Sequence, residues 1–194
     1  MKRVLEFNAG YGRLLNDHDE PSLQILCEQC DDVALQLTGI HPGADAANKL
    51  LTDAALPSAT QVRGSCIGIF DFSSSLIGVL IIRQHQPNEH DWYIGLLMFK
   101  PDMRARGYGH KVVEAFQHYV WEQRGKRILL AVMWSNPRAM AFWKRLGYET
   151  ARSLEPMQFG RLMQSGFELQ QRPNTYQNWP TPTMPVMHDR SAFE

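Results

Sequence analysis

The sequence contains little cysteine and has no excess of either charge. Its three cysteines, Cys27, Cys30 and Cys66, are few and odd in number for 194 residues, so they do not form the disulfide framework of a small secreted domain. Twenty Lys and Arg residues balance twenty Asp and Glu residues, which leaves no overall basic field for binding nucleic acid or anionic membranes. We therefore expect reduced thiols, no nucleic-acid partner and no membrane partner.

Long apolar runs are also missing. No run approaches the roughly 18 residues that a membrane-spanning helix needs, and residues 1–10 lack the apolar centre of a secretory signal. We therefore expect a cytoplasmic protein. The length suits one domain, which we place at residues 1–171. Residues 172–194 carry four prolines and little that can pack, so we expect a disordered tail or an arm on a neighbouring subunit, which leaves a homodimer open.

The rest of the chain is organised around residues 92–124. A strand-like run ends at Phe99, a short turn follows at residues 100–103, and the segment R-A-R-G-Y-G at residues 104–109 opens an amphipathic helix. The N–H groups in the first turn of a helix have no partner inside it, and the helix macrodipole adds positive charge there. This arrangement predicts a site for an anion such as a diphosphate.

Two helices and a hairpin are predicted before this stretch. A short strand is expected near residues 13–15, and apolar residues at helical spacing predict one helix from about residue 20 up to Gly39. A second helix is expected over residues 46–54, ended by Pro57. Two β-rich runs at residues 66–72 and 76–82 predict a hairpin.

After residue 124 the sequence predicts a buried strand, a helix and two more strands. The strand covers residues 128–134, Asn136 is a good N-cap for the helix, and Gly147 suits the position after its end. Residues 149–170 hold two strands with a break around Glu155 and Pro156.

Two segments of the chain resemble known motifs. Residues 99–109 are similar to the acyl-CoA motif of the Gcn5-related N-acetyltransferase (GNAT) superfamily, and residues 134–148 resemble the motif that follows it. The phrase at residues 92–97 is similar to an uncharacterised bacterial branch. The resemblance implies a mixed α/β fold with a central, mostly antiparallel sheet of six to seven strands and helices on both faces. The expected order is strand, two helices, three strands, helix, strand, helix and two strands.

The resemblance also implies acetyl-CoA as co-substrate. Backbone amides of residues 106–110 would hold the pyrophosphate, and Arg104 would add charge-assisted hydrogen bonds. The strand end at residues 97–99 would splay from its neighbour after Val132 and bind the pantetheine arm, with amides placed to stabilise an oxyanion. The implied coenzyme-binding residues are Leu97, Met98, Phe99, Arg104, Ala105, Arg106, Gly107, Tyr108, Gly109, His110, Lys111, Asn136 and Trp143.

The expected catalysts of the family are replaced here. Trp143 stands where many members carry a tyrosine acid, and Tyr93 stands where several carry a glutamate base. The thiolate would then leave unaided, and the base would be water relayed from Asp91, His90 or Glu89, with Tyr93 positioning the water. Tyr93 and Asp91 are the candidate catalytic residues. The C-x-x-C spacing of Cys27 lacks a second pair, so helix packing is the expected role and no metal site is predicted.

The function expected from the resemblance is transfer of an acetyl group from acetyl-CoA to a primary amine, by direct attack in a ternary complex. Two alternatives stay open. One is an acyl-CoA-binding module without turnover, suggested by the missing tyrosine and glutamate. The other is acetylation of a protein or peptide amine instead of a small molecule.

Overall fold

The computed structural model describes residues 3–55 and 63–173. These residues form one eight-stranded sheet in the order β1-β2-β3-β4-β5-β6-β8-β7, in which β5 and β6 are parallel and every other neighbouring pair is antiparallel. None of the described helices has the length and apolar character that crossing a membrane requires. The elements are β1 (Arg3–Phe7), β2 (Gly10–Leu14), η1 (Asp17–Asp19), α1 (Glu20–Gln29), α2 (Asp31–Thr38), α3 (Ala46–Ala55), β3 (Arg63–Asp71), β4 (Leu76–Gln84), β5 (Asp91–Phe99), η2 (Pro101–Met103), α4 (Tyr108–Glu122), β6 (Arg127–Met133), α5 (Pro137–Arg145), β7 (Glu149–Phe159) and β8 (Leu162–Gln171).

The N-terminal segment contains more structure than predicted. In place of one short strand near residues 13–15, β1 and β2 form a hairpin, which raises the strand count to eight. A Cβ at Gly10 would lie 2.0 Å from the Phe70 carbonyl oxygen, so glycine is required where β2 approaches β3. The predicted single helix up to Gly39 is two helices, because the chain turns at Cys30, whose buried thiol donates to the Phe99 carbonyl oxygen at 3.3 Å.

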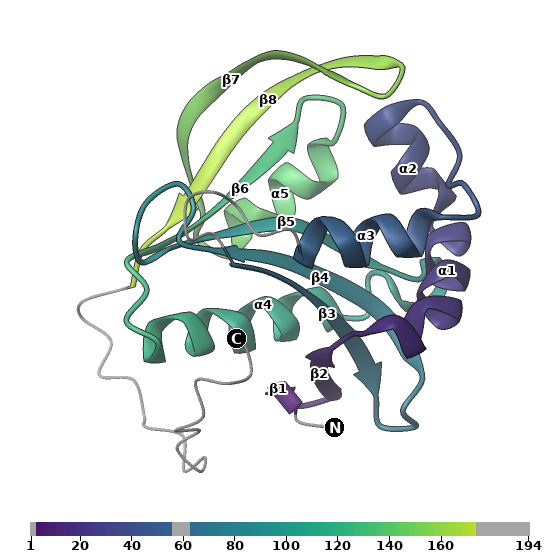
Figure 1. Cartoon of the computed structure of the whole chain (residues 1–194). Helices are drawn as coiled ribbons and strands as arrows, with labels where there is room; N and C mark the ends of the chain where they lie inside the picture. Colours follow the sequence, from purple (N-terminus) through teal and green to yellow (C-terminus); the bar gives the residue numbers. More distant parts are fainter. Residues whose placement is uncertain (1–2, 56–62, 174–194) are drawn as a thin grey trace.

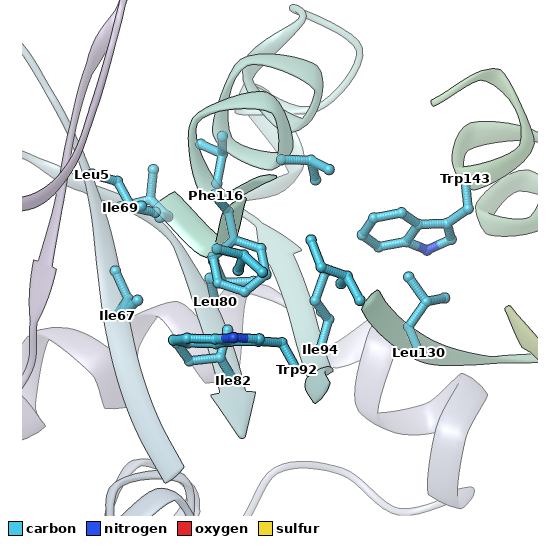
Figure 2. Packing of buried hydrophobic residues seen from close by; sticks show 14 of the residues in the cluster. Leu5, Ile67, Ile69, Leu80, Ile82, Trp92, Ile94, Phe116, Leu130 and Trp143 are labelled. Atoms are coloured by element: carbon cyan, nitrogen blue, oxygen red, sulfur yellow. The ribbon is translucent and has the colours of Figure 1, made fainter. Parts of the chain in front are cut away.

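Helices cover both faces of the sheet, as expected (Figure 1). On one face, α4 and α5 pack on a core that includes Trp92, Phe116 and Trp143. Figure 2 shows the ring of Phe116 close to that of Trp92, and the two centroids are 5.9 Å apart. On the other face, α1 and α3 bury Cys27 and Ala47 against β3, β4 and β5.

The strand β5 contains a bulge at Gly95. Ile81 pairs with Leu96 and Ile82 pairs with Ile94, so Gly95 has no partner on β4. The bulge reverses the alternation of side chains: Ile94 and Leu97 both contact the α4 core, whereas Leu96 and Met98 belong to the α1 side. A bulge also bends its strand, and the parallel ladder between β5 and β6 ends at Ile94 and Leu130. From Gly95 onward the two strands are split.

The other predictions hold with corrected boundaries. The β3–β4 hairpin is confirmed, and so is the α3 segment, although Pro57 lies outside the described residues. The helix α4 begins at Tyr108 and not at Arg104. The break predicted at residues 155–156 is wrong, since β7 continues to Phe159 through an irregularity between Leu154 and Met157. Proline is tolerated there because β7 is an edge strand.

Candidate active site

The loop between β5 and α4 forms an anion cradle, residues 104–111. Ala105 and Gly107 adopt positive φ angles of 58° and 83°, and such left-handed residues turn successive N–H groups toward one side as a nest. The first hydrogen bond of α4 runs from the Lys111 N–H to the Gly107 carbonyl at 3.2 Å. The amides of the first turn, residues 108–110, therefore have no partner inside the helix. The geometry matches the anion site predicted from the sequence.

A cavity of about 720 Å³, here called the α4 cavity, lies beside this cradle. It extends from the cradle along the split end of β5 to the start of α5. Its volume is within the range of small-molecule sites. Most of the predicted coenzyme-binding residues line it, namely Leu97, Met98, Phe99, Arg104, Ala105, Gly107, Gly109, His110 and Asn136.

Four predicted contacts are not part of this lining. The side chain of Arg106 is exposed to solvent, and Lys111 is half-buried on α4 behind the first turn. Tyr108 packs toward Phe99, with ring centroids 6.4 Å apart. Trp143 is 6% exposed and packs into the core (Figure 2). Its ring centroid is 5.0 Å from that of Tyr148. The packing role of Trp143 takes the place of the predicted coenzyme contact.

The guanidinium of Arg104 is already bound by protein groups. Its Nε donates to the Phe99 carbonyl oxygen at 2.9 Å, and its two terminal nitrogens donate to the carboxylate of Asp32. These bonds hold the pKa of the Asp32 carboxyl below its usual value. Arg104 therefore fixes the cradle to β5 and α2, while its predicted charge-assisted hydrogen bonds to the pyrophosphate stay a prediction.

Packing between helices favours glycine at position 109. A Cβ there would lie 3.2 Å from Cζ of Phe142 on α5, which is tighter than ordinary contact. A Cβ at Gly107 would meet nothing within 4 Å, so that residue is glycine because of its positive φ angle. Asn136 caps α5 as predicted, with its side-chain oxygen accepting from the Ala139 N–H at 3.0 Å.

The helix α5 contributes residues that the sequence interpretation missed. Arg138, Phe142 and Arg145 all line the α4 cavity. They follow one another at spacings of four and three residues, which places them on one face of a helix. That spacing was the signal in the sequence that could have identified them. Arg138 and Arg145 supply positive charge to the cavity, whereas the guanidinium of Arg104 is engaged by Asp32 and Phe99. Other lining residues outside the prediction are Asp32, Val33, Gln36, Met103, Ser135, Pro137 and Leu146.

Asp91 is a structural residue. It is 3% exposed, and its carboxylate accepts two hydrogen bonds of 2.8 Å from Arg127 and two more from Asn88. Burial acts to raise the pKa of Asp91, but the bonds from Arg127 and Asn88 outweigh it and hold the pKa below its usual value. Asp91 also pairs with Arg127 at the start of both strands, at the end away from the split. These contacts favour a structural role for Asp91, and its catalytic role stays an untested prediction.

Tyr93 is less able to act as a base at neutral pH than an ordinary tyrosine, because its phenol loses its proton only at a higher pH. Burial raises the pKa of its phenol, and the negative charge of Glu168 raises it further. Glu168 is the second buried carboxylate among the described residues, with a relative exposure of 9%. It pairs across the sheet with Ala131, one residue beyond Leu130, and so lies level with the split. Its carboxylate accepts two hydrogen bonds from Arg152, at 2.8 and 3.3 Å.

The cysteines are packing residues. Cys27, Cys30 and Cys66 are buried and free, and burial raises the pKa of Cys27 to about 11 and that of Cys66 to about 12. Both thiols are therefore protonated at neutral pH. No cluster of three metal-ligating side chains occurs within residues 3–55 and 63–173.

The sequence and the geometry together agree with one family. Residues 43–148, more than half of the chain, match the acetyltransferase (GNAT) family model. The chain belongs to the GNAT family. Acetyl transfer from a coenzyme A thioester is the general activity of this family. A comparison with curated protein sequences gave no match.

Solved structures show the same fold at low sequence identity. An acetyltransferase from Thermus thermophilus is 20% identical, with a TM-score of 0.67 over 89% of this chain and 100% of that one. A GNAT-family acetyltransferase from Bacillus anthracis is 12% identical, with a TM-score of 0.68 over 87% and 97%. A spermidine N-acetyltransferase from Vibrio cholerae, solved with CoA and spermine, is 16% identical, with a TM-score of 0.65 over 83% and 94%.

Proposed function

We propose that the protein transfers an acetyl group from acetyl-CoA to a primary amine by direct attack in a ternary complex. The observation that carries this proposal is the position of the β5–β6 split. The split opens into the same cavity as the unpaired amides of the cradle. A pyrophosphate would bind the cradle amides, and an extended pantetheine would lie along residues 97–99, the part of β5 that pairs with β4 but no longer with β6. A spermidine N-acetyltransferase of the same fold from Vibrio cholerae was solved with CoA, which supports coenzyme binding by this fold.

The reaction needs one bond to form and one to break. Acetyl-CoA supplies the thioester; the amine nitrogen forms the C–N bond to its carbonyl carbon, and the C–S bond breaks with its electron pair leaving on sulfur. The proton of the amine must pass to a base. Backbone N–H groups at the split would hydrogen-bond the carbonyl oxygen as negative charge grows on it.

We assign the base to Glu168 acting through a water molecule. Asp91 is fully engaged by Arg127 and Asn88, and the phenol of Tyr93 is too weak a base at neutral pH. Glu168 lies level with the split. Side chains alternate between the two faces along β8, and Phe167 and Leu169 contact the α4 core, so Glu168 lies on the opposite face. Glu168 therefore shares the face of Tyr93.

A second candidate function is acyl-CoA binding without turnover. The lowered pKa of Asp91 and the raised pKa of Tyr93 favour this function, since neither residue can take a proton from an ammonium group at neutral pH. The acceptor amine can also belong to a peptide, and the amine panel below includes one for that reason.

Two measurements test the proposal. Purified protein with acetyl-CoA at 100 times its dissociation constant should gain about 2.7 kcal/mol in free energy of unfolding. Thiol release should then be followed with small amines, lysine peptides and buffer alone. Stabilisation with amine-dependent thiol release supports the transferase. Stabilisation without turnover supports the binding module, and the absence of stabilisation contradicts both.

A further inference from the structure

A second pocket lies on the other face of β5. This α2 pocket, with a volume of about 330 Å³, is enclosed by α1, α2, α3 and the loop between the last two. Its floor is formed by Leu96 and Met98, and Met98 is 7% exposed. Ile40 lies at the rim, 41% exposed, beside the exposed residues His41 and Lys49. The pocket therefore runs from solvent down to the strand.

The α2 pocket meets the α4 cavity at two side chains. Val33 and Met98 line both spaces. Leu96 on the pocket floor directly precedes Leu97, which lines the α4 cavity. The bulge at Gly95 produces this arrangement, because it sends Leu96 and Met98 to the α1 side and Leu97 to the α4 side. One short piece of strand thus separates two spaces with separate openings, as a ternary complex needs.

The lining of the α2 pocket is apolar and its charges are paired. Asp45 is the one carboxylate in the lining, and it binds Lys49 at 2.9 Å. His41 lies 2.7 Å from a carboxylate oxygen of Asp31. The hydroxyl of Thr38 donates to the Ala34 carbonyl oxygen. A second ammonium group placed among these apolar side chains would lose its hydration, and the carboxylate in the lining is already paired with Lys49, which disfavours a polyamine.

Resting on the proposed function, we propose that the α2 pocket holds the apolar body of the acceptor amine, an aromatic or branched alkyl group. The volume is that of about ten water molecules, which suits a ring or a short branched chain. The amine end would lie toward the split of β5 and Glu168, and the apolar end toward Ile40. The separate opening at the rim favours an acceptor over the acyl chain of the donor, which enters with the coenzyme.

The test measures binding as well as turnover. Isothermal titration of phenethylamine and of spermine into the CoA-saturated protein should show binding of phenethylamine at least tenfold tighter. With saturating acetyl-CoA, kcat/KM should rise about fourfold for each methylene from ethylamine to hexylamine. Tighter binding of spermine, or equal kcat/KM along the series, would overturn the proposal.

Filling the pocket provides the matched variants. Ala34→Leu places a larger side chain in the α2 pocket and should weaken phenethylamine binding at least tenfold with CoA binding unchanged; Ala141→Leu, exposed on α5 and outside both cavities, is the control. Ala46→Leu serves if Ala34→Leu does not fold. If hexanoyl-CoA binds more tightly than acetyl-CoA and Ala34→Leu removes that gain, the pocket belongs to the donor and the proposal is wrong. Absence of CoA binding would instead refute the proposed function, and the free protein would then be titrated with phenethylamine.

Discussion

Asp32 in α2 and Arg104 before α4 are joined by two hydrogen bonds of 2.5 and 2.9 Å. The same guanidinium binds the end of β5 through the Phe99 carbonyl oxygen. Three elements that meet at the α4 cavity are thus held together by one side chain. Preorganisation of this kind lowers the ordering cost of ligand binding.

Arg104→Ala should therefore weaken CoA binding about tenfold, equal to about 1.4 kcal/mol. The loss arises because the cradle is no longer fixed to α2 and β5. Arg106→Ala is the matched control, since its side chain is exposed and outside the cavity lining. Isothermal titration with CoA measures both variants. Equal losses in the two variants would contradict the positioning role of Arg104.

Replacing both Arg138 and Arg145 by alanine should weaken CoA binding about tenfold in about 0.05 M NaCl and less in about 0.5 M NaCl, because salt screens exposed charges. Both residues line the cavity and are exposed. The dissociation constant is measured at each salt concentration. Arg124→Ala, exposed after the end of α4, is the control. A loss that does not depend on salt would argue for a packing role.

Gly109→Ala should reduce CoA affinity about fivefold while changing the free energy of unfolding by less than about 1 kcal/mol, since better helix propensity offsets crowding. The added methyl group pushes on Phe142, which lines the cavity. Gly107→Ala should lower the free energy of unfolding by about 1 kcal/mol, because alanine is strained at the positive φ angle of this position. Its effect on CoA affinity should be smaller than that of Gly109→Ala. Thermal unfolding and CoA titration separate the two. Unchanged CoA affinity in Gly109→Ala would contradict the prediction.

Glu168→Gln should lower kcat at least about 100-fold if the carboxylate receives the amine proton. The dissociation constant for CoA should not change, because Glu168 is not part of the α4 cavity lining. Glu149→Gln on the exposed edge of β7 is the control. A fall in stability with an unchanged kcat would show that Glu168 only binds Arg152.

Asp91→Asn should lower the free energy of unfolding by about 3 kcal/mol at neutral pH, because Arg127 loses its buried partner. The pKa of Asp91 is lower in the folded state, so the unfolded chain binds more protons as the pH falls. The stabilisation is present above pH about 4 and is lost as the pH falls through the folded pKa. Denaturant unfolding across this range should show a weaker acid dependence for the variant. Its kcat should stay near that of the unchanged protein, in contrast to Glu168→Gln.

Features with local causes were predictable from the sequence. The cap at Asn136 and the stop at Gly147 depend on residues within one helix, and the structure has α5 where they place it. The cradle also follows from a local pattern, the R-A-R-G-Y-G segment at residues 104–109. The family assignment drawn from the two motifs is confirmed by the match over residues 43–148.

Features with distant causes were not predictable. Asp91 is fixed by Arg127, 36 residues away, and no spacing in the sequence indicates that pair. The division of the first predicted helix depends on Cys30 reaching Phe99. Pro156 fits in β7 because no strand of the described sheet lies beyond β7, which is a property of the whole sheet. In each case a tertiary contact outweighs the local pattern.

The bulge at Gly95 gives β5 one residue more than its neighbour. Eight residues of β5, from Trp92 to Phe99, match seven residues of β4, from Gly78 to Gln84. The alternation of side chains between the two faces therefore reverses in the middle of β5. For this reason a search for apolar residues at every second position of the whole strand finds no clear pattern. The strand consists of two short strands in series: the first completes the sheet, and the second is turned over so that its two sides face the α4 cavity and the α2 pocket. The two-sided site thus originates from surplus chain length in a single strand.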